Sequence, residues 1–244
     1  MAGKTTTTTR KKKSTPAPPP KPALGRRLLR WTGRFFMGLA AFYLALILIF
    51  AFVPPPINIY QLQEAARLGG ISKDWVAMDD IAPVMARSVV AAEDANFCNH
   101  WGFDMAAIRA AIAEGNGRGA STLSQQTVKN VFLWQGRNWL RKAMEAGLTP
   151  FAELVWTKRR MLTLYLNVAE FGEGVFGVQA AAQHYFGVDA IDLTPVQAAR
   201  LAAALPNPKV RNPANPTGQM RRRAGQILDG AETIRVDGRA ACFE

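Results

Sequence analysis

The pattern of apolar and polar residues divides the chain into a polar start, one long apolar run and a region of amphipathic segments. The uncharged run from Phe35 to Val53 can cross the roughly 30 Å hydrocarbon core of a bilayer, at about 1.5 Å of rise per residue. A cleaved signal peptide is the alternative, but this run is longer and begins later than the apolar region of such peptides. The pattern therefore predicts a single-pass transmembrane helix over residues 35–53.

The segment before this run has too little apolar surface to fold. Residues 1–34 combine a Thr run, a Lys/Arg cluster and several prolines, which is typical of a disordered tail. Positively charged flanks stay on the cytoplasmic side of a membrane, so residues 54–244 should form one domain on the outer side. The flank consists of Arg26, Arg27, Arg30 and Arg34.

The remaining region has helical periodicity and almost no alternation with period two, which predicts a mainly α domain. Asp104 should cap a helix that stops at Gly115, and Thr194 with Gln197 should form a capping box with Pro195 at the first helical position. Further helices are expected near residues 81–93, 121–130, 138–166, 175–185 and 219–229.

The net charge of +12 suggests nucleic-acid binding until it is apportioned along the chain. Residues 1–34 hold ten basic and no acidic side chains, so the other residues keep 20 basic and 18 acidic groups. A domain with this balance has no electrostatic footprint for nucleic acid, and we exclude nucleic acid as its partner.

Cysteine and histidine are too scarce for a disulfide framework or a structural zinc site. Only Cys98 and Cys242 are present, and both a disulfide between them and two free thiols remain open. The spacing of Cys98 and His100 lacks the gap typical of zinc ligands, so no metal-ligating residue is predicted.

Polar residues concentrate in three further segments. Glu93 and Asp94 end an apolar helix, where the helix dipole does not favour a carboxylate, although a solvated helix end is the alternative. The segment 118–130 joins a glycine turn to a Ser/Thr-rich helix start that suits an anion, or is an ordinary cap formed by Thr122 and Gln125. In 136–147, Arg141 and Glu145 share a helix face and could be a simple surface pair.

Together these segments resemble the glycosyltransferase family 51 domain of bacterial cell-wall synthases, and most closely its monofunctional members, over roughly residues 60–230. The family signatures appear as EDANFCNHWG from Glu93, GASTLSQQTVKN from Gly119 and RKAME from Arg141. The fourth, KRRMLTLYLN, departs from the pattern at Met161 and Thr163, so we expect only a structural role for that helix. A weaker fifth signature begins at Arg223.

The resemblance implies a lysozyme-like helical fold and inverting transfer of lipid-linked disaccharide units, with release of polyprenyl diphosphate. It also implies that Glu93 is the catalytic base and Glu145 a second carboxylate of the cleft. A base must take the proton of the attacking hydroxyl, and fixed cations must stabilise the diphosphate. The substrate-binding candidates are Lys129, Arg137, Arg141, Lys142, Ser121, Thr122, Gln125, Gln126, His100, Asp94 and Arg109.

The resemblance also indicates the setting. The substrates are lipid II and the growing lipid-linked glycan chain, at the periplasmic face of the bacterial inner membrane. No cofactor is expected, although some members use Mg or Mn, which leaves metal dependence open. The chain lacks the S-x-x-K segment of a transpeptidase, so crosslinking would fall to partner proteins of cell-wall synthesis. Phe132, Trp134 and Trp139 would either touch lipid or pack inside the domain.

A lytic enzyme and a membrane-bound scaffold are the two alternative functions. A lytic enzyme of the same shape would cleave finished glycan with one glutamate, and it would not need the cations Lys129, Arg137 and Arg141. A membrane-bound scaffold for other synthases would tolerate degenerate motifs, whereas the first three motifs here are intact.

Overall fold

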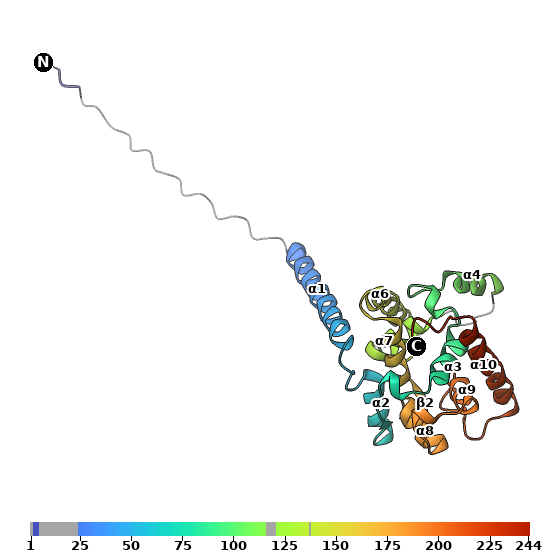
Figure 1. Cartoon of the computed structure of the whole chain (residues 1–244). Helices are drawn as coiled ribbons and strands as arrows, with labels where there is room; N and C mark the ends of the chain where they lie inside the picture. The colour runs from blue at the N-terminus through green and yellow to red at the C-terminus, as the bar shows by residue number, and fades with distance from the viewer. Residues whose placement is uncertain (1, 5–23, 116–120, 137) are drawn as a thin grey trace. The chain divides into compact units, whose positions relative to one another are not determined.

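The structure is a computed structural model that describes residues 2–4, 24–115, 121–136 and 138–244. Its contacts divide the chain into two units, Met1–Phe42 and Tyr43–Glu244. The described part of the first unit is mostly the start of helix α1 (Leu24–Phe50), and the second unit is a helical domain (Figure 1). Most of the predicted tail, residues 1 and 5–23, lies outside the described residues.

Helix α1 is long and apolar enough to cross a membrane, and an 18-residue stretch within Gly25–Phe50 has a mean hydropathy of 2.0. It begins at Leu24 rather than Phe35, because the arginines and leucines before Phe35 are good helix formers that continue the helix beyond the apolar run. It ends at Phe50 rather than Val53, shortly before Pro54–Pro56 exclude helical geometry.

The described part of the domain is built mainly from α-helices, with three very short strands and three single turns of 3-10 helix. The helices are α2 (Ile59–Leu68), α3 (Pro83–Glu93), α4 (Met105–Glu114), α5 (Leu123–Phe132), α6 (Trp139–Val155), α7 (Lys158–Val168), α8 (Val178–Phe186), α9 (Pro195–Ala204) and α10 (Gly218–Val236). The strands are β1 (Ser72–Lys73), β2 (Glu170–Gly172) and β3 (Val175–Phe176), and the 3-10 turns are Met78–Asp80, Phe97–Asn99 and Ala190–Asp192.

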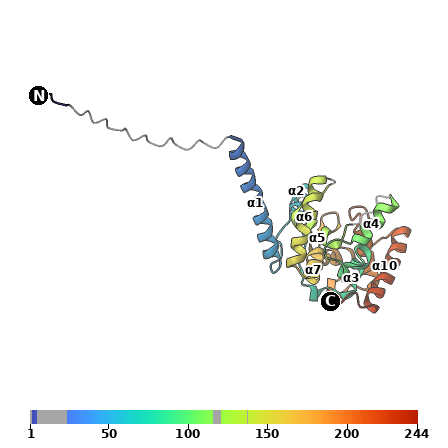
Figure 2. The ribbon, with the colours of Figure 1, turned by 90° about the horizontal axis from the view of Figure 1, so that it is seen from above.

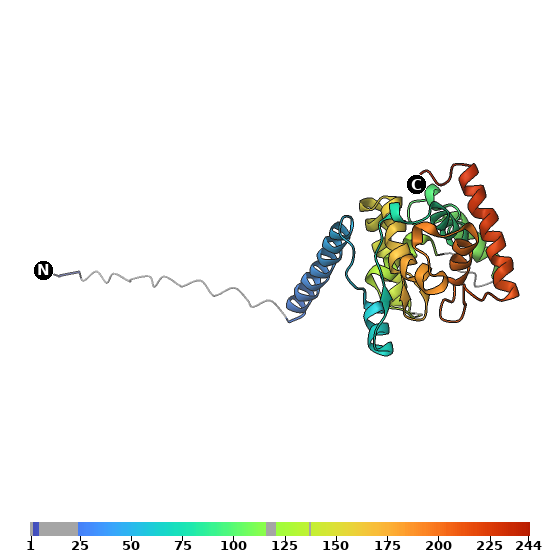
Figure 3. The same ribbon diagram turned by 60° about the horizontal axis from the view of Figure 1, so that its bottom comes forward.

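Two groups of helices form the core of the domain. Helix α5 packs against α6 and α7, and α3 packs against α9 and α10. Figure 2 shows the first group on one side and α3 with α10 on the other, while Figure 3 shows α10 along one edge. The α7 segment from Met161 to Val168 is buried throughout, which agrees with the structural role expected for the fourth signature.

A three-stranded sheet in the order β1-β3-β2 was not predicted. Strand β1 pairs in parallel with β3, and β2 pairs antiparallel with β3 through a bulge. The strands have only two or three residues each, too few for a period-two pattern to be visible in the sequence. The sequence also missed α2, although Asn58 and Gln61 form a capping box at its start.

The predicted caps are confirmed. Asp104 accepts hydrogen bonds from two backbone amides at the start of α4, which ends at Gly115. Thr194 and Gln197 form the capping box of α9. The predicted helix 138–166 is wrong as one element, because Thr157 caps a new helix and the chain turns at Trp156.

The C-terminal residues return to the domain rather than hanging free. Cys242 forms a disulfide with Cys98, 144 residues away in the sequence. Phe243 is fully buried and its ring lies 6.4 Å from that of Phe97. Arg87 forms an ion pair with Glu244. This segment therefore fastens to the loop that follows α3.

Candidate active site

Glu93 is the last residue of α3, at the point where the α3 group of helices meets α5. The Gln126 side-chain amide on α5 donates a hydrogen bond to Glu93 Oε2 at 2.9 Å. The Tyr165 hydroxyl on α7 donates in turn to Gln126 Oε1 at 3.2 Å. Because Tyr165 is buried in the core, this chain of hydrogen bonds holds the carboxylate in a fixed position.

The protonation of Glu93 is shifted by its surroundings. Burial raises the pKa of its carboxyl group, because the charged form loses water. The hydrogen bond from Gln126 and the charges of Arg223, Lys129 and Arg211 act in the opposite direction and lower that pKa. Burial is the largest effect, so Glu93 is a stronger base than an exposed glutamate.

Asp94 and His100 face each other rather than open space. His100 Nε2 lies 2.9 Å from Asp94 Oδ2, and both side chains are buried. The backbone amide of Leu123, at the start of α5, donates to the same carboxylate oxygen at 2.9 Å. These contacts tie the loop after Glu93 to the start of α5.

The polar start of α5 is also largely engaged within the protein. Thr122 and Gln125 form the capping box, and the Thr122 hydroxyl donates to the Gly102 carbonyl at 2.6 Å. Gly102 has a φ of +84°, and a Cβ there would lie 2.9 Å from Thr149 Cγ2. Thr122 of the second signature therefore holds the first signature, and the close approach of Thr149 on α6 favours glycine at position 102.

A cluster of charges lies along α5 and α6. Glu145 is buried, and its carboxylate pairs with Arg141 at 2.7 Å and with Lys142. Lys142 also donates to the Ser121 hydroxyl at 3.0 Å. Arg141 and Glu145, for which a simple surface pair was the alternative, do form an i,i+4 ion pair, but this pair is largely buried.

Lys129 is the cation without an ion-pair partner in this cluster. No carboxylate of the described residues lies within ion-pair distance of its ammonium group. Burial lowers the pKa of Lys129, while the nearby carboxylates of Glu145 and Glu93 raise it. A partly buried ammonium with unused donors is suited to bind an anionic group that enters from outside.

One predicted substrate-binding residue lies apart from this cluster, and another cannot be placed because it lies outside the described residues. Arg137 lies outside the described residues. Arg109 is exposed on α4, and no contact in the described part of the chain joins it to Glu93 or Lys129. Of the three aromatic residues, Phe132 is buried, Trp134 packs against the core and Trp139 is 81% exposed.

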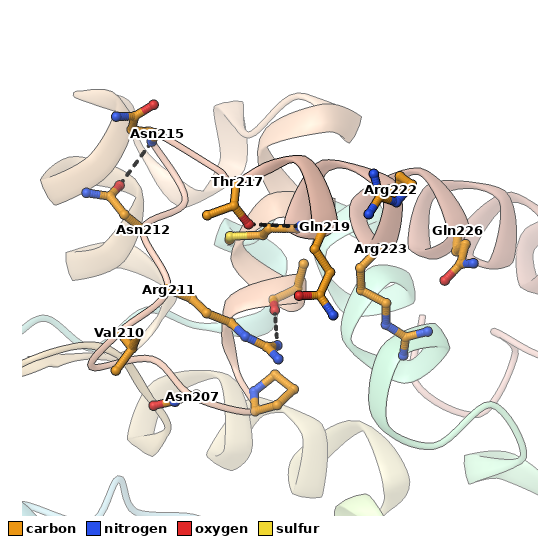
Figure 4. A pocket seen from close by; sticks show the side chains of 13 residues that line it. Asn207, Val210, Arg211, Asn212, Asn215, Thr217, Gln219, Arg222, Arg223 and Gln226 are labelled. Atoms are coloured by element: carbon orange, nitrogen blue, oxygen red, sulfur yellow. Dashed lines mark hydrogen bonds between the residues drawn. The ribbon is translucent and has the colours of Figure 1, made fainter.

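Glu93 and the residues whose charges act on it line three pockets. Glu93 and Ser121 line a pocket of about 220 Å³, and Gln126 and Lys129 line one of about 270 Å³. A larger pocket of about 690 Å³ lies between the end of α9 and the start of α10, and Arg211 and Arg223 line it (Figure 4).

The sequence analysis gave no role to Arg211 and only a weak signature to Arg223. Arg223 donates to the carbonyl of Ala92, next to Glu93, at 3.0 Å. The signature at Arg223 was a usable signal. Nothing in the local sequence marks Arg211. It lies in the loop 205–217, far from Glu93 along the chain.

The described residues do not form a site for a resident metal ion. No group of three or more His, Cys, Asp or Glu side chains gathers in the described part of the chain. The only carboxylate of the cation cluster, Glu145, is already neutralised by Arg141 and Lys142. Mg²⁺ is usually held by one or two carboxylates together with substrate phosphates, so a metal ion that binds with the substrate would not require such a group.

Comparison with known proteins matches this chain to one protein family and to individual proteins. The family model described as Transglycosylase matches residues 61–232. A biosynthetic peptidoglycan transglycosylase from Jannaschia sp. is 62% identical over 220 residues, which cover 90% of this chain and 92% of that protein. A protein of the same description from Yersinia pseudotuberculosis is 50% identical over 210 residues, which cover 81% and 87%.

Proposed function

Because this chain belongs to the transglycosylase family and is a peptidoglycan glycosyltransferase, we propose that Glu93 is the general base of its glycosyl transfer. The observation that carries this proposal is the setting of the carboxylate. Its pKa is raised by burial, it accepts a hydrogen bond from Gln126, and it lies among Lys129, Arg211 and Arg223. A base close to Lys129, an ammonium group that can bind the diphosphate, is what the transfer requires.

The reaction joins the C4 hydroxyl of one sugar to the anomeric carbon of another, which carries a polyprenyl diphosphate. Glu93 takes the hydroxyl proton as the new C–O bond forms on the face opposite the leaving group. The bond from the anomeric carbon to the diphosphate breaks, and its electron pair leaves with the phosphate oxygen. The configuration at that carbon is inverted.

Lys129 and Arg141 supply the positive charge that the departing diphosphate needs. The Lys129 ammonium has no ion-pair partner among the described residues, so its donors are available to phosphate oxygens. Arg141 is held by Glu145 at 2.7 Å and by the Gly136 carbonyl at 2.9 Å, so it is ordered before substrate binds. Glu145 is therefore a positioning residue rather than a second base.

We propose that the protein holds no metal ion of its own. The cations of α5 and α6 take the place that a divalent ion would occupy beside a diphosphate. Polymerisation should then persist when a chelator such as EDTA removes divalent ions, and strict dependence on added Mg or Mn would contradict this part of the proposal.

The apolar helix indicates membrane anchoring, and we propose that it lies in the inner membrane with the N-terminus in the cytoplasm. Arg26, Arg27 and Arg30 support this orientation because positive flanks resist translocation. The disulfide between Cys98 and Cys242 also favours an oxidising compartment for the domain. Glycan strands made there require a separate crosslinking reaction, so transpeptidases are the proposed partners.

The experiment that tests the base is polymerisation of purified lipid-linked disaccharide-pentapeptide by the full-length protein in detergent. Wild type should give glycan chains and polyprenyl diphosphate, and Glu93→Gln should lose at least about 100-fold in rate. Glu173→Gln, an exposed residue that pairs only with Arg67 in the described structure, is the matched control and should keep full activity.

Other outcomes separate the alternatives. Cleavage of finished glycan without polymerisation would indicate a lytic enzyme. Glycan binding with neither reaction, by folded protein, would indicate a scaffold. Activity that survives Glu93→Gln would disprove the role of the base while leaving the family assignment intact.

A further inference from the structure

The large pocket beside Glu93 has a composition that neither the base nor the diphosphate cluster explains. It lies between the end of α9, the loop 205–217 and the first turns of α10, with a volume of about 690 Å³. Figure 4 shows the side chains of Arg211 and Gln219 meeting in its middle, with Arg223 beside them. A pocket of this size can hold a short peptide or a drug-sized ligand.

The lining of this pocket selects for a particular chemistry. It contains three guanidinium groups and five carboxamide side chains, and no carboxylate. No acidic residue in the described part of the chain forms an ion pair with Arg211, Arg222 or Arg223. Guanidinium groups bind carboxylates through paired N–H donors, and carboxamides match the N–H and C=O groups of a peptide backbone.

Two of the guanidinium groups are held in place before any ligand binds. Arg211 donates to the Ala203 carbonyl at 2.7 Å, and Arg223 donates to the Ala92 carbonyl at 3.0 Å. Each bond uses one donor and leaves the others available. Ordered donors lose little conformational freedom on binding, which favours recognition of a specific anion.

The other parts of the substrate indicate which of its groups is the anion that this pocket binds. The diphosphate has its own cations, Lys129 and Arg141, on α5 and α6. Sugar hydroxyls are neutral and need no guanidinium groups. The part of a lipid-linked disaccharide-pentapeptide that is both anionic and rich in amides is its peptide.

We propose that the pocket lined by Arg211, Gln219, Arg222 and Arg223 binds the carboxylate-bearing peptide of the disaccharide substrate. This inference rests on the proposed function, because it assigns a second part of the same substrate to a second part of the same cleft. It explains why Arg223 of this pocket bonds to the Ala92 carbonyl next to Glu93, since peptide and reacting sugar belong to one molecule. The peptide contact fixes the sugar beside the base.

The test compares three lipid-linked disaccharides with full-length wild-type protein: one with free peptide carboxylates, one with those carboxylates amidated and one without peptide. Loss of a charge-assisted contact should lower kcat/KM about tenfold or more for the second and third substrates. The change should appear mainly in KM, because the peptide does not take part in the chemical step.

Variants then locate the contact in this pocket. In Arg211→Gln and in Gln219→Ala, the preference for free carboxylates should shrink at least severalfold, whatever the remaining rate. Arg235→Gln lies on the same helix α10, pairs with Glu232 and should keep the wild-type preference. Because the comparison is a ratio between substrates, a general loss of stability in one variant does not affect it.

The outcomes distinguish this inference from the function on which it rests. Equal polymerisation of all three substrates by wild type would overturn the peptide site and leave the glycosyltransferase assignment standing. A preference that persists unchanged in Arg211→Gln and Gln219→Ala would overturn the assignment to this pocket. Failure to polymerise any substrate would count against the proposed function itself.

Discussion

At the scale of single residues, the activity of Glu93 should depend on pH in a way that its surroundings set. Burial raises the pKa of its carboxyl group, and the base is active only when ionised. Activity should therefore be lost as the pH falls through this raised pKa. The acid limb of kcat/KM should lie above the range of an ordinary glutamate.

The hydrogen bond from Gln126 gives a direct check of this explanation. It stabilises the ionised carboxylate, so it lowers the pKa of Glu93. Gln126→Leu should move the acid limb of the kcat/KM profile to higher pH. Gln183→Leu, which removes an amide bonded to Asp189, is the control and should leave the profile unchanged. If the acid limb of the kcat/KM profile does not shift in Gln126→Leu, then another group sets the pH dependence.

Gly102 should be irreplaceable for steric reasons. An alanine there combines a φ of +84° with a Cβ that would lie 2.9 Å from Thr149 Cγ2. Gly187 has a similar φ of +66°, but a Cβ there would meet nothing within 4 Å. Gly187→Ala should cost about 1–2 kcal/mol of unfolding free energy, and Gly102→Ala roughly 2–4 kcal/mol.

A second substitution separates the clash from the backbone strain. Thr149→Ser removes the Cγ2 methyl and keeps the hydroxyl that donates to the Glu145 carbonyl. Gly102→Ala with Thr149→Ser should recover part of the lost stability in a thermal unfolding measurement. No recovery would mean that the positive φ alone accounts for the cost.

At the scale of elements, the C-terminal segment and the loop after α3 behave as one unit. Arg239 donates to the Ala95 carbonyl at 2.9 Å, and Phe243 is buried against Phe97. The disulfide between Cys98 and Cys242 makes this connection covalent. The loop that carries the first signature is thereby held from both α5 and the C-terminus.

Removal of the disulfide should therefore destabilise the domain. Changing both Cys98 and Cys242 to Ser should lower the unfolding free energy by about 2–5 kcal/mol, because the crosslink closes a long loop in the unfolded chain. A reducing agent should lower the melting temperature of wild type to that of the double variant and leave the variant unchanged. Equal melting temperatures with and without reductant in wild type would contradict the role of the bond.

At the scale of the whole molecule, helix α1 contributes residues to both units. Its apolar stretch is largely exposed, as suits a lipid environment. Its last turns belong to the domain: Ile47 is fully buried, and its carbonyl accepts a hydrogen bond from Trp156 Nε1 at 2.8 Å. Phe50 stacks on Phe132 with ring centroids 5.9 Å apart.

Two truncations should thus differ sharply. Protein that starts at Tyr43 keeps these contacts and should unfold in detergent at nearly the temperature of the full-length chain. Protein that starts at Pro54 loses Ile47 and Phe50 from the core, and its unfolding free energy should fall by several kcal/mol, roughly the cost of two large cavities. Identical melting temperatures would show that the helix end does not support the domain.

The sequence by itself determined the elements whose signals are local. The apolar run, the caps of α4 and α9 and the helical class all rest on residues within a few turns of one another, where side chain and backbone interact directly. The ordered signatures likewise indicated the family and its activity, and the matches confirm both. The roles of the individual site residues stay predictions.

The tertiary structure decided whatever depends on residues far apart in the chain. Cys98 meets Cys242, Arg223 reaches the end of α3, and the end of the membrane helix enters the core. Asp94 and His100 are paired with each other. Such contacts arise when helices pack to bury their apolar faces, and a local pattern states which face is apolar but not which partner will cover it.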